Sequence, residues 1–159
     1  MLSRRFLPRR PLFNAALGVI AASMVLTSQG TAVAAANPYT PEGICGAGYR
    51  VIDSMLLRNV LSSSDAVGGR TYLLYNSGNK YNCVVTIKSV AVGTPSQVTA
   101  DLQIFSGNSV DKAYRDRGNY TYYAGPVKAY AAGKCVATYG DVKAGGNSYA
   151  NSSPKGHCG

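Results

Sequence analysis

Apolar and polar residues alternate along much of this chain, most clearly in QVTADLQIF, residues 97–105. In this run every second residue is apolar, namely Val98, Ala100, Leu102 and Ile104. The polar residues between them are Thr99, Asp101 and Gln103. Because side chains of an extended strand point alternately to its two faces, this pattern predicts a half-buried strand with Asp101 on its solvent-facing side.

Other segments predict further short strands. GYRVIDS (48–54) alternates as well, although both of its faces are mixed. TYLLYN (71–76) and YNCVVTIKSV (81–90) flank SGNK (77–80), which is typical of a hairpin turn because glycine and asparagine tolerate positive φ. KCVATYGDV (134–142) and GNSYAN (146–151) add two more. About seven or eight strands at this spacing predict an all-β, single-domain antiparallel sandwich or small barrel.

One segment fits two structures. SMLLRNVL (54–61) fits one or two helical turns capped by Ser54, and it fits a continuing strand nearly as well. The polar, glycine-rich SSSDAVGGR (62–70) that follows is typical of a loop.

The first 36 residues have the pattern of a secretory signal peptide. A basic segment, MLSRRFLPRR, precedes an apolar stretch at 12–26 and a small-residue end, TAVAAA. Since this stretch is shorter than the roughly 20 residues of a membrane-spanning helix, we expect cleavage, and not an uncleaved membrane anchor. Ala34 and Ala36 both fit the cleavage rule, and we favour Ala36, which leaves one β-rich domain at 37–159. SRRFL loosely resembles a twin-arginine signal, but the general secretory route fits better.

Charge limits the partners of the exported chain. Cleavage would remove four of the 16 basic residues and none of the seven acidic ones, so the net charge of +9 would fall by four. The densest basic patch, DKAYRDRG (111–118), fits a solvated loop or edge better than an anionic-polymer site, because acids are interleaved with its bases. We expect no nucleic-acid partner without a basic face, and no membrane partner after cleavage. A mild attraction to acidic wall polymers is consistent with the remaining charge.

The four cysteines form an even set in a chain expected to be exported, and an oxidising compartment favours disulfides. Four cysteines allow three connectivities. We favour the pairs nearest along the chain, Cys45 with Cys83 and Cys135 with Cys158. A metal site is the alternative, but there is no C-x-x-C pair and His157 is the only histidine. We therefore expect no metal and no cofactor.

Groups that could perform catalysis are few. We place Asp65, Asp111 and Asp116 in loops and Asp101 on a solvent face, which leaves Glu42, Asp53 and Asp141 as conceivable acids and bases. No serine lies in a G-x-S-x-G elbow, and no nucleotide-binding motif is present. A hydrolase would need two of the carboxylates to meet in a cleft, and nothing marks such a pair. We expect a protein that is not an enzyme.

Tyrosine is the unusual residue: there are twelve, and no tryptophan. Most suit half-buried sheet positions, where the ring packs and the hydroxyl reaches water. In NYTYYAGPVKAY (119–130), a hairpin turning at Gly125 and Pro126 would set Tyr120 and Tyr122 against alanines in the interior. Its other face would carry Tyr123, Lys128 and Tyr130. These three residues are the predicted ligand-binding set.

The chain as a whole resembles a known family. NPYTPEGICGAGYRVIDS (37–54), TYLLYNSGNKYNCVVTIK (71–88), YYAGPVKAYAAGKCV (122–136) and the terminal HCG are similar to the spore-associated protein A family of filamentous actinobacteria. These blocks include all four cysteines. SMLLRNVLSSSDAVGGR (54–70) and the stretch CVATYGD depart from the family pattern. The resemblance implies a small exported protein found with spores and aerial growth, and it implies no catalytic residues.

Two functions follow as expectations. The first is a secreted, non-enzymatic protein at the spore or hyphal surface that binds wall polymer or surface proteins. The alternative is a secreted protease inhibitor or antimicrobial protein, which would need an exposed rigid loop near a disulfide. SSSDAVGGR and DKAYRDRG are the candidate loops.

Overall fold

The computed structural model describes residues 36–159; residues 1–35, which hold nearly all of the expected signal peptide, lie outside the described part. The described chain forms one short helix and eight strands. They are α1 (Pro41–Cys45), β1 (Arg50–Asn59), β2 (Val67–Asn76), β3 (Tyr81–Lys88), β4 (Ser96–Ser106), β5 (Ser109–Tyr120), β6 (Tyr123–Tyr130), β7 (Cys135–Ala144) and β8 (Asn147–Ser152). Within 36–159, no helix has the length and hydropathy of a membrane span.

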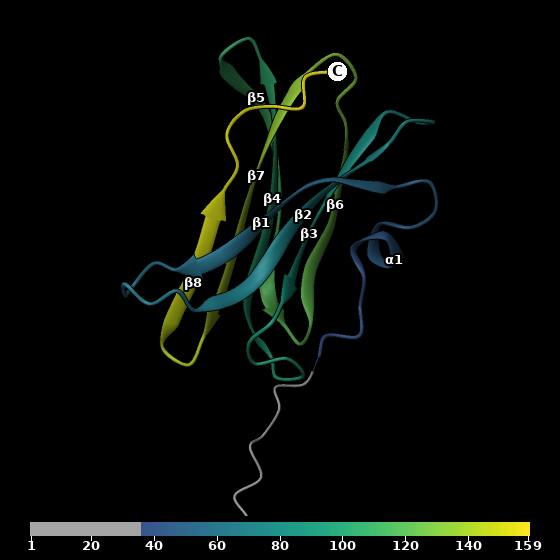
Figure 1. Ribbon diagram of the computed structural model, residues 1–159. Helices are drawn as coiled ribbons and strands as arrows, with labels where there is room; N and C mark the ends of the chain where they lie inside the picture. The colour runs from purple at the N-terminus through teal and green to yellow at the C-terminus, as the bar shows by residue number, and fades with distance from the viewer. Residues whose placement is uncertain (1–35) are drawn as a thin grey trace, which may run out of the picture. The chain divides into compact units, whose positions relative to one another are not determined.

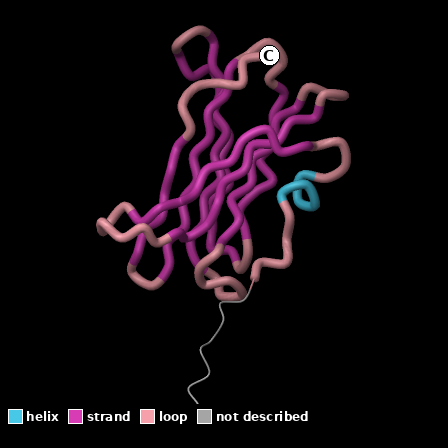
Figure 2. The backbone as a smooth tube through the Cα atoms, in the orientation of Figure 1, coloured by secondary structure: helices cyan, strands magenta, loops and turns pink. Residues whose placement is uncertain are grey.

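All eight strands belong to one antiparallel sheet, in the order β5-β4-β7-β8-β1-β2-β3-β6. The sheet curls until it is nearly closed into a barrel, with the outermost strands β5 and β6 brought near each other (Figure 1). Apart from α1, Figure 2 shows only strands and their connections in this part of the chain. The predicted all-β antiparallel class is confirmed, and of the two expected architectures the sheet adopts the barrel.

β4 lines the barrel interior as its alternation predicts. Val98, Ala100 and Leu102 are fully buried and Ile104 is 2% exposed. They pack in one cluster with apolar residues of β2, β3, β6 and β7. Along β4 the interior is therefore built from every second residue, which is the periodicity that a half-buried strand requires.

The prediction for the outer face of β4 is wrong. Asp101 is 0% exposed and does not face solvent. Arg115 lies directly opposite on β5, and its Nε and Nη2 atoms lie 2.7 and 2.5 Å from Asp101 Oδ2. The long Arg115 side chain covers the acid. Asp111 and Asp116 lie in β5 and not in loops, whereas Asp65 is in a loop as expected.

The turn predicted at Gly125 and Pro126 is also wrong. β6 continues through both residues, and the chain reverses before it, at Thr121 and Tyr122. β6 pairs only with β3 and is an edge strand, so the missing N–H of Pro126 breaks no second ladder. The register shifts between Val84 and Thr86 on β3, where a bulge accommodates the Gly-Pro pair.

The ambiguous segment at 54–61 is a strand as far as Asn59. β1 pairs with β2 along most of its length and with β8 at Arg58 and Asn59, so its backbone is hydrogen-bonded within the sheet. The loop expected at 62–70 is shorter than predicted, because β2 begins at Val67. The predicted β2–β3 hairpin around 77–80 is confirmed.

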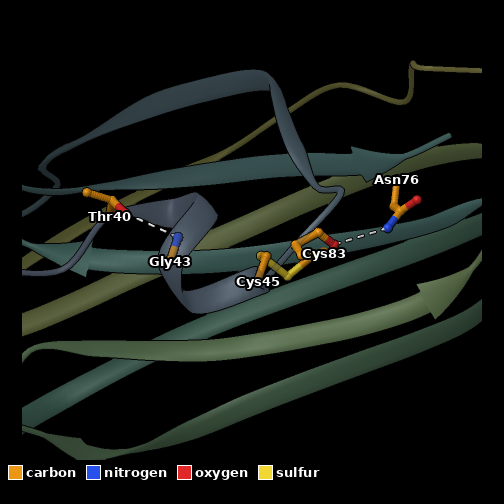
Figure 3. The surroundings of a disulfide bond; sticks show 6 residues. Thr40, Gly43, Cys45, Asn76 and Cys83 are labelled. Carbon is orange, nitrogen blue, oxygen red and sulfur yellow. Dashed lines mark hydrogen bonds between the residues drawn. A yellow bond between two sulfur atoms is a disulfide. The ribbon is translucent and has the colours of Figure 1, made fainter. Parts of the chain in front are cut away.

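A second apolar cluster lies on the outer face of β2 and β3, beneath the N-terminal segment 37–49. Leu74, Val85 and Ile87 of the two strands pack with Cys45 and Tyr49 of this segment. Thr40 caps α1 by accepting a hydrogen bond from the Gly43 N–H at 3.1 Å. Figure 3 shows this cap beside the Cys45–Cys83 disulfide, which fixes α1 to β3. The disulfide thus holds a cover over apolar side chains.

The second disulfide joins Cys135, at the start of β7, to Cys158 near the C-terminus. The expected pairing is therefore confirmed for both bonds, and none of the four cysteines is free. His157, beside this bond, places Nε2 3.0 Å from Asp53 Oδ2 on β1. These contacts keep the end of the chain against the barrel.

Candidate functional site

The three residues predicted to bind a ligand lie on the outer face of β6. Tyr123 pairs with Ile87, Lys128 with Cys83 and Tyr130 with Tyr81 of β3. The alternate residues of β6, including Ala124, Val127 and Ala129, point into the barrel and are buried. The faces were predicted from a wrong turn. Lys128 and Tyr130 share a face through the strand's period of two, whereas Tyr123, five residues before Lys128, joins them because the bulge at Gly125 and Pro126 shifts the alternation by one residue.

Tyr130 and Tyr81 form an exposed aromatic pair. Tyr130 is 59% exposed and Tyr81 is 39% exposed. Their ring centroids are 5.8 Å apart, with an interplanar angle of 67°. This edge-on geometry is favoured by the ring quadrupoles and holds both rings in place while one side stays open to solvent.

Lys128 lies over a buried tyrosine. Its Nζ is 5.0 Å from the centroid of the Tyr49 ring, within the range of a cation–π contact. Tyr49 is 8% exposed, and burial raises the pKa of its phenol, so the ring stays neutral beneath the ammonium. Lys128 itself is exposed. The contact fixes a positive charge beside the Tyr81–Tyr130 pair.

Tyr123 belongs to a second aromatic group at the other end of β6. The Tyr39 ring lies 4.9 Å from that of Tyr123 and 5.2 Å from that of Tyr122. The Asn37 amide nitrogen donates to the Tyr122 carbonyl at 2.8 Å and to the Lys88 carbonyl at 3.2 Å, which fastens the start of this segment. A shallow hollow of about 330 Å³ lies among these tyrosines and Gly125.

The two groups together make up what we call the aromatic face: Tyr39, Tyr122 and Tyr123 at one end of β6, and Tyr49, Tyr81, Lys128 and Tyr130 at the other. Tyr120, expected in the interior, packs against the core; Tyr122, expected there too, lies in the bend and contacts Tyr39. At roughly 3.3 Å per residue, the eight residues of β6 separate the groups by about 23 Å. Exposed tyrosines with one fixed cation suit a hydroxylated polymer more than a compact metabolite.

Sequence reasoning missed Tyr39, Tyr49 and Tyr81 as parts of this face. Tyr81 could have been predicted, because it is the first residue of β3 after the expected hairpin. It lies two residues before Cys83 and so shares the outer face with it. Tyr39 and Tyr49 come from the N-terminal segment, which crosses onto β3 and β6 only in the folded chain. No periodic signal in the sequence indicates that contact.

The conceivable acids and bases are held by structural partners or stay apart. Asp53 pairs with His157, and Glu42 lies exposed on α1. Asp141 is 4% exposed and accepts hydrogen bonds from Thr99 Oγ1 at 3.3 Å and Ser148 Oγ at 3.4 Å. In residues 36–159, no group of three or more His, Cys, Asp or Glu side chains is placed to hold a metal ion.

Comparison with known proteins gives one informative relative. Spore-associated protein A of Streptomyces coelicolor is 34% identical over 122 residues, which cover 76% of this chain and 71% of the relative. No protein-family model matches the chain, and no solved structure matches it significantly. The similarity thus extends over most of both proteins.

Proposed function

Because the chain belongs to the spore-associated protein A family, we propose that it is an exported protein of the spore or hyphal surface that binds wall polymer. In this proposal it performs no catalysis and acts by adhesion. Surface proteins are the second kind of partner that the aromatic face suits. The name of the relative supports the location, and the surface chemistry of β6 supports the binding role.

One observation carries the binding role: the exposed Tyr81–Tyr130 pair beside Lys128 on an edge strand. Exposed aromatic rings cost free energy in water unless a partner covers them, and clustered ones mark interaction surfaces. The open faces of the two rings can stack on sugar rings, while the phenol hydroxyls and the ammonium reach polar groups. Weak contacts repeated along a polymer then add up through effective concentration.

The candidate loops for an inhibitor give the alternative function less support. Residues 111–118 lie within β5 and form no loop. The loop before β2 carries the exposed Val60 and Leu61, but it contains none of the four disulfide-bonded cysteines. The adhesive role is therefore the better supported of the two.

The first prediction tests adhesion with matched tyrosine variants. The purified protein should sediment with spore walls at low salt, and Tyr130→Ala or Tyr81→Ala should weaken this binding about tenfold, as loss of a central aromatic contact does. Tyr114→Ala is the control, because Tyr114 is 38% exposed on β5 and does not belong to the aromatic face. Absence of sedimentation, or an equal loss with Tyr114→Ala, would contradict the proposal.

A further inference from the structure

A separate groove lies on the outer face of β4, β5, β7 and β8. It has a volume of about 400 Å³ and is lined mainly by polar side chains, among them Gln103, Arg115, Tyr139, Ser153 and Lys155. None of these residues belongs to the aromatic face. The charges and hydrogen-bond donors that line the groove determine the kind of ligand that it can bind.

The pairing of the strands explains why the surface is hollow at this point. Gln103 of β4 lies between Ala113 of β5 and Ala137 of β7 in the sheet. The neighbouring row consists of the larger residues Arg115, Asp101 and Tyr139. Small residues beside large ones leave a depression whose floor is Ala137 and Gln103.

A buried acid positions Arg115 at the groove. Asp101 is fully buried, its Oδ2 accepts a hydrogen bond from Arg115 Nε at 2.7 Å, and Arg115 Nη2 lies 2.5 Å from the same oxygen in the ion pair. A guanidinium carries five N–H donors, so this contact leaves others available. The Arg115 side chain is 56% exposed. The ion pair therefore fixes the orientation of the cation and leaves part of it open to a ligand.

A second cation is held from the other side of the groove. Lys155 Nζ donates to Asn108 Oδ1 at 2.6 Å and to the Gly107 carbonyl at 3.1 Å, and it lies 5.9 Å from the centroid of the Phe105 ring. An ammonium has three donors, and these two bonds use two. No carboxylate is among these partners, so the charge of Lys155 is not neutralised there.

Hydroxyl groups line the same groove as the two cations. Ser153 Oγ accepts from the Thr138 N–H at 2.9 Å and from Thr138 Oγ1 at 3.3 Å, which leaves its own O–H free to donate. Burial, and then the charge of Asp141, raise the pKa of the Tyr139 phenol. Tyr139 is therefore a neutral donor around pH 7. The groove offers donors of both kinds, charged and neutral.

We propose that this groove binds an anionic, polyhydroxylated ligand, such as an acidic sugar or a sugar phosphate, with Arg115 and Lys155 contacting the anion. Tyr139, Ser153 and Gln103 then bind the hydroxyl groups. Charge-assisted hydrogen bonds to a carboxylate or phosphate are stronger than neutral ones, so the two cations supply most of the affinity. The site is independent of the proposed adhesion through β6 and adds a second ligand class.

Titration of the ¹⁵N-labelled protein with three sugars tests the proposal. Glucuronate or glucose 6-phosphate should shift the amide resonances of Gln103, Tyr139 and Ser153, whereas glucose should shift them far less. Response to glucuronate alone assigns acidic polysaccharides as the source of the ligand, and response to glucose 6-phosphate alone assigns polyol or sugar phosphates. Either result supports the shared chemistry. No shift at the groove with either anion, or equal shifts with glucose, would overturn it.

Variants that keep the Arg115–Asp101 pair avoid a loss of folding. Lys155→Gln should weaken binding of the anionic sugar about tenfold, the loss expected for one charge-assisted bond, and Tyr139→Phe by a smaller factor. Lys143→Gln is the control, because Lys143 is an exposed cation on β7 that does not line the groove. If acetate binds as tightly as glucuronate, or if Lys155→Gln binds as wild type does, the assignment fails. Tyr130→Ala should leave this binding unchanged.

Discussion

At the scale of single residues, Lys88 departs most from ordinary behaviour. It is 1% exposed inside the barrel, and its Nζ donates to the carbonyls of Thr94 at 2.7 Å and Tyr120 at 3.1 Å. Neither partner is charged, and desolvation lowers the pKa of the Lys88 ammonium. The amine thus ties the β3–β4 connection to the end of β5 at a cost in desolvation.

The second prediction follows from this burial. Lys88→Met should lower the free energy of unfolding by about 1 to 3 kcal/mol at pH 7, because the charge-assisted hydrogen bonds to the Thr94 and Tyr120 carbonyls are lost. The folded pKa lies below the unfolded value of 10.5, so the unfolded state binds more protons between them. Wild-type stability, relative to Lys88→Met, should therefore rise with pH in that window.

Urea unfolding of both proteins at pH 7 and pH 9.5 measures this difference. Tyrosine ionisation affects the two proteins alike and cancels. Lys143→Met, at an exposed position on β7, should show neither the loss nor the pH dependence. A difference between wild type and Lys88→Met that stays constant or shrinks as pH rises would show that the amine is not desolvated.

At the scale of elements, most of the strands could be predicted from the sequence. The neighbouring side chains and segments that cover their outer faces could not. Alternation locates β4 and its inner residues, and Gly78 and Asn79 locate the β2–β3 turn. The burial of Asp101 depends on Arg115, which a hairpin brings across from it, so the strand's own pattern shows the acid as exposed. Likewise, Gly125 and Pro126 suggest a turn unless β6 is already known to be an edge strand.

In the candidate site, too, some positions could be predicted from the sequence and others could not. Lys128 and Tyr130 are two residues apart in one strand, so their common face is a local property that the alternation predicts. Tyr123 shares that face only because the bulge at Gly125 and Pro126 shifts the alternation, and the sequence does not reveal this bulge. The positions of Tyr39 and Tyr49 depend on the N-terminal segment folding back over β3, which is a tertiary contact. The groove at Arg115 and Lys155 is assembled from four strands and a terminal segment, and spacing in the sequence indicates none of it.

The third prediction concerns the element that covers the outer cluster. Removing the first disulfide with Cys45→Ala and Cys83→Ala should lower the unfolding free energy by about 3 to 4 kcal/mol in the chain-entropy model. It should also raise binding of a hydrophobic dye, since the segment at 37–49 then detaches from Leu74, Val85 and Ile87. The matched variant with Cys135→Ala and Cys158→Ala loses a similar loop constraint.

Dye fluorescence separates the two disulfides. Cys135 and Cys158 are not members of the outer cluster, so their removal should free the C-terminus without exposing that cluster. Equal dye binding by the two double variants would show that the first disulfide adds only a loop constraint and does not hold a cover.

At the scale of the whole barrel, a side chain of β5, and not a ladder of backbone hydrogen bonds, connects β5 to β6. β5 and β6 are the two edges of the sheet and, within the described residues, are not paired with each other. Asp116 of β5 spans the gap: its Oδ2 accepts from the Gly125 N–H of β6 at 2.7 Å, and its Oδ1 accepts from the Tyr120 hydroxyl. Farther along, residues 109–115 of β5 are exposed. The edge is thus bridged only near the β5–β6 turn, and charged residues line the rest of it, which disfavours pairing with another chain.

The fourth prediction is that Asp116 controls this closure. Asp116→Ala should lower the unfolding free energy by about 1 to 3 kcal/mol and speed hydrogen exchange at the Gly125 amide, because that donor loses its acceptor. Asp116→Asn keeps one acceptor oxygen and should give a smaller change in both. Asp111→Ala, which removes an ion pair with Lys134 at the exposed end of β5, should leave Gly125 exchange unaltered. If the Gly125 amide exchanged as slowly in Asp116→Ala as in wild type, core packing between β4 and β6 would be what keeps β5 and β6 together. The Asp116 carboxylate would then make no contribution to closure.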